Sequence, residues 1–308
     1  MNQVNRRDFL KKSLFVGVGL TLIPKLANGT LSSSGLALPD IAVVTGNDYF
    51  KNTITAIEQI GGISKFVPRG SKVGLLINAP AYWTKPGSYT HTEVVLAAIK
   101  LINDAGASNI IFLLDQSPDL FKRSSLSVQY QSIIDSIKKN SGEYKEVNLP
   151  KAVTMKNPKV IKDLLDVDIF INIPINKHHS GVQYTGCLKN MMGACHRDTN
   201  KTFHTGGNGK EDDVEHLAQC IADINLLRKP DLCITDATEV LKTNGPFGPG
   251  EIIKPHKVFA GVNPVEMDAY GCTILDNRPE DIRTNVLANK HGLGSYDLKS
   301  FIVKETTL

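Results

Sequence analysis

The feature that most constrains the fold is a near-continuous apolar run at residues 167–175, which reads VDIFINIPI. A strand with one exposed face alternates apolar and polar residues, whereas a strand covered on both faces is apolar throughout. The run therefore predicts a strand buried inside a parallel sheet. Pro174 marks the point where the chain leaves that strand.

Strand-like and helix-like segments alternate along the rest of the chain. Further strands are expected at 73–78, 109–114, 232–237 and 257–261. Helices are expected after a capping box formed by Thr90 and Glu93, over much of 126–139, over 214–230, and from Pro264 with Asn263 as N-cap. This alternation predicts an α/β fold with a mostly parallel sheet and helices on both faces. Length allows one body or two lobes, and without a linker signal we treat residues 31–308 as one catalytic or binding domain.

Residues 5–29 read NRRDFLKKSLFVGVGLTLIPKLANG, which has the pattern of an export signal. The paired Arg6 and Arg7 select the twin-arginine subtype, so residues 1–30 are expected to engage the twin-arginine export machinery. The apolar stretch from Ser13 to Ile23 is shorter than the ~20 residues that span a bilayer. We therefore expect a periplasmic or otherwise extracytoplasmic protein, in contact with a membrane only through this segment if it is not cleaved.

Without the first 28 residues the chain is electrically neutral. The whole chain has 35 Lys and Arg against 31 Asp and Glu, and residues 1–28 hold five of the former and one of the latter. Thirty of each remain. A neutral domain has no basic footprint for a phosphate backbone, so nucleic acid is not an expected partner.

The five cysteines are too widely spaced for a metal-binding or redox pair. No C-x-x-C occurs, so the sequence has no iron–sulfur motif and no zinc-knuckle spacing. Buried free thiols are expected at Cys220, Cys233 and Cys272, and no disulfide is expected to be needed for folding.

Polar residues follow several of the predicted strands. Asn78 follows the first, Asp115 the second, Asp236 lies near the end of 232–237, and the segment NKHHSG follows Pro174. In open α/β sheets ligands bind beyond the carboxyl ends of the strands. These residues are therefore expected at one ligand-binding edge.

Several motifs in this region resemble the domain of unknown function 362 family. They are INIPINKHHS, TGCLKNMMG, KTFH, LCITDATE, NGPFGPGE and AGVNPVEMDAYG, and the resemblance covers roughly residues 70–303. Leu76 and Ile77 stand where the family has a lysine before Asn78. The family has no established activity, so the resemblance implies site residues rather than a reaction. These are Lys177, His179, Thr185, Gly186, Lys189, Asn190, His204, Asp236, Gly245, Pro246, Gly250 and Asp268.

One interpretation of these residues is a metal site. Imidazoles and carboxylates bind divalent transition metals, and two histidines with a carboxylate can form an open catalytic site. We expect His179, His204 and Asp268 as metal ligands, with His178 competing with His179, for a metal whose identity the sequence does not give. The alternative is that these histidines only hydrogen-bond loop carbonyls.

A second interpretation is an anion site. Lys177 and Lys189 can hold a carboxylate, phosphate or sulfate beside a glycine-rich turn, and a desolvated lysine can act as a base or nucleophile. Together with Asp236 they are the expected catalytic residues. The expected cofactor-binding residues are Asn78, Thr185, Gly186 and Asn190.

Two classes of function fit these observations. The first is an exported metal- or cofactor-dependent enzyme that acts on a small anionic or polyhydroxylated molecule. The second is a non-catalytic metal or cofactor carrier, or a maturation partner of an exported redox protein. A preformed cavity would favour the enzyme, whereas a flat apolar rim around Met191, Met192 and Phe203 would favour the partner.

The export signal gives the first testable prediction. Replacing Arg6 and Arg7 together by lysine should leave the precursor in the cytoplasm, because the twin-arginine machinery reads the arginine pair. Cell fractionation followed by immunoblotting measures this. Normal export of the double variant would contradict the twin-arginine assignment.

Overall fold

An eight-stranded sheet forms the centre of the computed structural model, which describes residues 37–80, 85–205 and 213–308. Its strand order is β14-β1-β13-β10-β7-β2-β3-β4. Within this sheet every strand pair is parallel except the two that involve β13, so the predicted mostly parallel α/β fold is confirmed. The strands are β1 (Ile41–Thr45), β2 (Lys72–Ile77), β3 (Asn109–Phe112), β4 (Lys138–Lys139), β7 (Ile169–Ile173), β10 (Leu232–Ala237), β13 (Lys257–Gly261) and β14 (Val303–Thr307). The predicted export signal lies outside the described residues.

The near-continuous apolar run forms β7, which lies between β2 and β10. Phe170, Ile171 and Ile173 are fully buried. Ile171 and Ile173 pack into the cluster on one face of the sheet, and Phe170 packs into the cluster on the other face. A strand with both faces covered has apolar residues on both of them, which explains the pattern in the sequence. Asn172, the polar residue of β7, is also buried and donates to the carbonyl of Cys187 at 2.9 Å.

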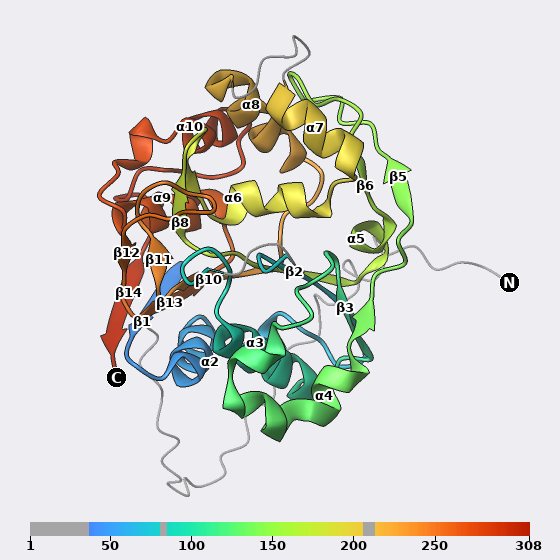
Figure 1. The fold of residues 1–308 in the computed structure, drawn as a ribbon, viewed down its shortest axis with the longest axis vertical. Helices are drawn as coiled ribbons and strands as arrows, with labels where there is room; N and C mark the ends of the chain where they lie inside the picture. Colours follow the sequence, from blue (N-terminus) through green and yellow to red (C-terminus); the bar gives the residue numbers. More distant parts are fainter. Residues whose placement is uncertain (1–36, 81–84, 206–212) are drawn as a thin grey trace, which may run out of the picture. The chain divides into compact units, whose positions relative to one another are not determined.

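Helices cover both faces of the sheet, and Figure 1 shows α2, α3 and α4 on one side with α6 to α10 on the other. Residues 38–308 form one compact unit. Among the described helices, none has the length and apolarity to cross a membrane. The helices are α2 (Tyr49–Gln59), α3 (Thr92–Asp104), α4 (Gln131–Ser136), α5 (Lys162–Asp166), α6 (Cys187–Asn190), α7 (Arg197–Thr205), α8 (Val214–Ile224), α9 (Pro264–Thr273) and α10 (Arg283–Lys290).

Two predicted helix starts have different outcomes. Asn263 is the N-cap of α9, and its side-chain oxygen accepts N–H bonds from the first turn, as predicted. The predicted capping box at the start of α3 is wrong. The N-cap is His91, whose Nδ1 accepts the N–H of Glu93 at 3.3 Å. The hydroxyl of Thr90 instead donates to the carbonyl of Ile173 at 3.0 Å, so it joins the helix entry to the end of β7.

The helix predicted over 126–139 is shorter than expected. A 3₁₀-helix over Ser125–Tyr130 precedes α4, and the chain is extended again at Ile137. Lys138 and Lys139 then pair with β3 as the edge strand β4. The helix has to end at Ser136 because the following residues take a place in the sheet.

Asp268 on α9 fixes the start of α6. Its Oδ1 accepts the N–H of Cys187 at 2.5 Å, and its Oδ2 accepts the N–H of Leu188 at 2.9 Å. Burial raises the pKa of this carboxyl to about 7 against the opposing effect of these bonds. A Cβ at Gly186 would lie 2.2 Å from the Asp268 Oδ1. The glycine therefore lets the two elements pack, and α6 supplies two residues of the predicted site.

Removing the Asp268 carboxyl should destabilise the fold. Asp268→Ala leaves two buried N–H groups without an acceptor, and each such group costs ~1–3 kcal/mol. Urea unfolding followed by circular dichroism should show that the free energy of unfolding falls by roughly that amount. Asp268→Asn keeps one side-chain oxygen as an acceptor, so its free energy of unfolding should fall by less. Wild-type stability of the alanine variant would contradict this anchoring role.

All five cysteines are buried free thiols, including the three for which this was predicted. Cys187 lies near Thr235, with a distance of 3.4 Å between the sulfur and the hydroxyl oxygen. Burial raises the pKa of the Cys195 and Cys220 thiols, the latter to about 12, which keeps both protonated.

Reductant should therefore leave the stability unchanged. Thermal unfolding with and without dithiothreitol is expected to give the same midpoint, because no covalent bridge would be broken. A loss on the ~2–5 kcal/mol scale of a native disulfide would instead reveal a bridged pair.

Candidate functional site

A cavity of about 1040 Å³ lies beyond the carboxyl ends of β2, β3 and β7, where the parallel sheet was predicted to bind its ligand. Asn78 follows β2 and Asp115 follows β3, and both line it. Of the other predicted site residues, the cavity is lined by His179, Thr185, Lys189, Asn190 and His204. Lys177, Gly186, Asp236 and Asp268 are not among its lining residues.

His179 enters the cavity from a short hairpin formed by β8 (Lys177–His179) and β9 (Gln183–Thr185). Its Nδ1 accepts the backbone N–H of Gly181 at 3.0 Å and lies 3.4 Å from the N of Val182. Burial lowers the pKa of His179 to about 2, and the charge of Lys189 adds to the shift. The imidazole is therefore neutral, and because Nδ1 is an acceptor, its proton is on Nε2.

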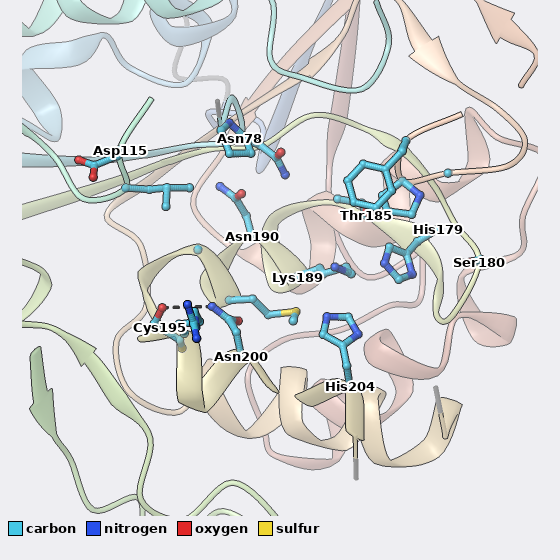
Figure 2. A pocket seen from close by; sticks show the side chains of 18 of the residues that line it. Asn78, Asp115, His179, Ser180, Thr185, Lys189, Asn190, Cys195, Asn200 and His204 are labelled. Atoms are coloured by element: carbon cyan, nitrogen blue, oxygen red, sulfur yellow. Dashed lines mark hydrogen bonds between the residues drawn. The ribbon is translucent and has the colours of Figure 1, made fainter. Parts of the chain in front are cut away.

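Lys189 and His204 approach His179 from two other elements. Lys189 is on α6 and His204 is on α7, and both are half-buried. Figure 2 shows the three side chains pointing into the same part of the cavity. The charges of Lys189 and His204 both lower the pKa of His179, which agrees with this proximity.

Amide and hydroxyl groups form a second part of the wall, as Figure 2 shows for Asn78, Thr185 and Asn190. The Asn190 amide donates to the carbonyl of Leu76 at 3.0 Å and to the Asn172 Oδ1 at 2.7 Å. These two bonds fix α6 against the strands. The Asn78 Oδ1 and the Thr185 Oγ1 are buried and have no hydrogen-bond partner among the described residues. Buried polar atoms without a partner are uncommon, and both of these atoms belong to residues that line the cavity.

Lys177, the first residue of β8, is fully buried. Its Nζ donates to the carbonyl oxygen of Ser88 at 2.6 Å and lies 3.3 Å from that of Pro246. Burial, aided by the charge of Lys189, lowers the pKa of Lys177 well below its usual value. Its amine therefore joins two loops next to the cavity.

Asp236 lies at the end of β10, away from the main cavity. One of its carboxylate oxygens accepts the His91 N–H at 2.5 Å, and the other accepts the N–H and hydroxyl of Thr238. Burial raises the pKa of this carboxyl. It faces a separate pocket of about 100 Å³ that His91 and Glu239 also line.

The described residues contain no group of three His, Cys, Asp or Glu side chains that could hold a metal ion. His179 and His204 line the same cavity, but Asp268 is engaged with the start of α6. The three residues predicted as metal ligands are therefore not brought together.

The structure adds cavity residues that the sequence motifs did not indicate. Arg197 and Asn200 line the cavity from α7. They precede His204 by seven and four residues, which is the spacing of one helix face, so helical periodicity around His204 could have found them. Tyr144 comes from β5 (Tyr144–Glu146), and no feature of the sequence links that strand to the site.

Comparisons with known proteins found a curated protein and a solved structure that resemble this chain. The thylakoid-associated protein sll1697 of Synechocystis sp. (strain ATCC 27184 / PCC 6803 / Kazusa) is 24% identical over 244 residues, which are 78% of this chain and 74% of that protein. The lactate racemase apoprotein from Thermoanaerobacterium thermosaccharolyticum matches with a TM-score of 0.46 and 12% identity over 76% of this chain. The match spans 56% of that protein's chain.

The family model described as domain of unknown function (DUF362) matches residues 73–273, well over half of the chain. This range contains the described cavity residues. The chain belongs to the DUF362 family.

Proposed function

We propose that this protein is an enzyme that binds a small anionic or polyhydroxylated molecule in the cavity and moves a proton on it. The observation that carries the proposal is the convergence of His179, Lys189 and His204 on one part of a preformed cavity. Titratable groups gathered in a cavity that a ligand can enter are typical of active sites.

The charges around the cavity favour an anion. Among the described lining residues, Lys189 and Arg197 are basic and Asp115 is acidic. The Nε2–H of His179 is a further donor beside Lys189. A hydrogen bond to a charged group is stronger than a neutral one, and shielding from water strengthens it further.

His204 is the proposed proton-transfer group. An imidazole can both accept and donate a proton through its two ring nitrogens. His204 lies on α7 across from His179 and is accessible from the cavity. The amides of Asn78 and Asn190 and the hydroxyl of Thr185 would orient hydroxyl groups of the bound molecule.

A transition metal on His179 fits the geometry less well. A metal-bound histidine normally donates its other ring N–H to an acceptor, whereas the His179 Nδ1 accepts the N–H of Gly181. Metal binding through Nε2 would require this hydrogen bond to break. We therefore propose a hydrogen-bonding role for His179 and leave the expected metal as the alternative to be tested.

The carrier or partner function has less support. An apolar rim around Met191, Met192 and Phe203 would have favoured it, but Met191 and Phe203 are fully buried and Met192 is 7% exposed. Export remains a proposal based on Arg6 and Arg7, with a periplasmic or otherwise extracytoplasmic location and the twin-arginine machinery as partner.

Binding of inorganic sulfate tests the anion site. Lys189→Ala should weaken sulfate binding by about ten- to a hundredfold, because a charged hydrogen bond contributes ~1.5–3 kcal/mol. His179→Gln keeps an N–H donor and should lose less affinity than His179→Leu. Isothermal titration calorimetry measures these differences.

Lys304→Ala is the matched control, because Lys304 is exposed on the edge strand β14. Its affinity for sulfate should equal that of the wild type. Since the pKa of His179 is about 2, its share of the binding should not change between about pH 5 and 8. Equal sulfate affinity in the wild type and the Lys189→Ala variant would contradict the anion site.

Elemental analysis of protein purified after native export tests the metal alternative. The proposed hydrogen-bonding role predicts that His179→Ala does not change the metal content. A stoichiometric transition metal that both His179→Ala and His204→Ala lose would instead assign these imidazoles to a metal.

A further inference from the structure

The loop of residues 244–248 forms one wall of the cavity. It connects β11 (Val240–Leu241) to β12 (Ile252–Ile253), which pair in an antiparallel hairpin. We refer to residues 244–248 as the rim loop. All five of its residues line the cavity, so the loop is a continuous part of the wall.

The rim loop is fixed to the hairpin that carries His179. The N–H of Ser180 donates to the carbonyl of Gly245 at 3.0 Å, and the N–H of Gly245 donates to the Nδ1 of His178 at 3.0 Å. The Nζ of Lys177 lies 3.3 Å from the carbonyl oxygen of Pro246. Lys177, His178 and Ser180, which flank His179, thus form hydrogen bonds to Gly245 and Pro246 of the rim loop.

The backbone contact between the two segments is close. A Cβ at Gly245 would lie 1.8 Å from the carbonyl oxygen of His178, which no side chain could tolerate without a backbone shift. Glycine allows this approach because it has no Cβ. The rim loop is therefore a preformed wall, and its contacts with the hairpin fix its position relative to His179.

Phe247 is the large apolar residue of this wall. It lines the cavity and is 52% exposed. Further apolar lining comes from Pro80, Leu114, Met192 and Pro246. An exposed aromatic ring on a preformed loop is a suitable contact surface for a flat group of a ligand.

The size of the cavity also indicates a ligand larger than a simple anion. A volume of about 1040 Å³ is at the upper end of the ~300–1,000 Å³ range of pockets for drug-sized ligands. A sulfate or a short carboxylate would fill a small part of it. A ligand that occupies the cavity must extend from the cationic part into the apolar part.

We infer that the natural ligand is an anion that also bears an aromatic or heteroaromatic ring, and that Phe247 contacts this ring. This inference rests on the proposed function, since Lys189 and His179 hold the anionic group. Phe247 is then a specificity-determining residue, and the rim loop fixes the distance between the ring and the anionic group.

Binding of three sulfonates tests the inference. Methanesulfonate carries the anionic group alone, benzenesulfonate adds a ring, and butanesulfonate adds a flexible apolar chain. Wild-type protein should bind benzenesulfonate about tenfold more tightly than methanesulfonate, and more tightly than butanesulfonate. Isothermal titration calorimetry at one pH and ionic strength gives the three affinities.

Variants then connect the ring preference to Phe247. Phe247→Ala should reduce the preference for benzenesulfonate by about three- to tenfold and leave methanesulfonate binding unchanged, whereas Phe247→Tyr should retain the preference. Leu298→Ala, at an apolar residue that is 42% exposed but does not line the cavity, should behave as the wild type.

The outcomes separate the two proposals. If methanesulfonate and sulfate bind through Lys189 but the ring adds no affinity, or if Phe247→Ala keeps the full ring preference, the inference is overturned and the anion site stands. Equal gains from the ring and from the butyl chain also overturn it. If none of these anions binds, both the proposed function and this inference are overturned.

Discussion

The site depends on the parallel ladder that joins β7 to β2 and β10. Since β7 is covered on both faces, a slip of one residue would turn its core side chains to the wrong face, so its register is strongly set. The chain leaves the sheet at Pro174 and continues into the hairpin of His179 and then into α6. The hydrophobic core thus determines where His179 and Lys189 lie.

Three buried charged residues connect the loops around this ladder. Lys177, Asp236 and Asp268 are each no more than 1% exposed, and burial of an ionisable polar group is costly unless hydrogen bonds compensate for it. Each forms at least one hydrogen bond to a backbone group from another part of the chain. The motif residues that resemble the family therefore divide into two sets. One set faces the cavity, and the other joins the segments that form it.

Much of the fold could be predicted because it follows from local patterns. The apolar run of β7, the Asn263 cap and the alternation of strands and helices each depend on neighbouring residues in the sequence. The start of α3 could not be predicted, because the hydroxyl of Thr90 donates a hydrogen bond to the carbonyl of Ile173, which is far away in the sequence. A local capping pattern does not contain that competing contact.

The candidate site was predictable in part for the same reason. His179, Lys189 and Asn190 follow one strand, so the motif and the sheet edge together indicate them. The sequence could not show that Asp268 lies outside the cavity while these residues line it. The carboxyl of Asp268 accepts the backbone N–H groups of Cys187 and Leu188, and such contacts depend on the tertiary structure. Tyr144 reaches the cavity only through tertiary packing.

The turn after His179 determines the chemistry that this histidine can perform. Gly181 brings its N–H to the Nδ1, and a Cβ at this position would lie 3.3 Å from the His179 Cε1, so a larger residue would crowd the ring. The same N–H that orients the imidazole also assigns its proton to Nε2. A neutral donor beside the ammonium group of Lys189 is suited to an anion. A cation in the same place would meet both the hydrogen of Nε2 and the charge of Lys189.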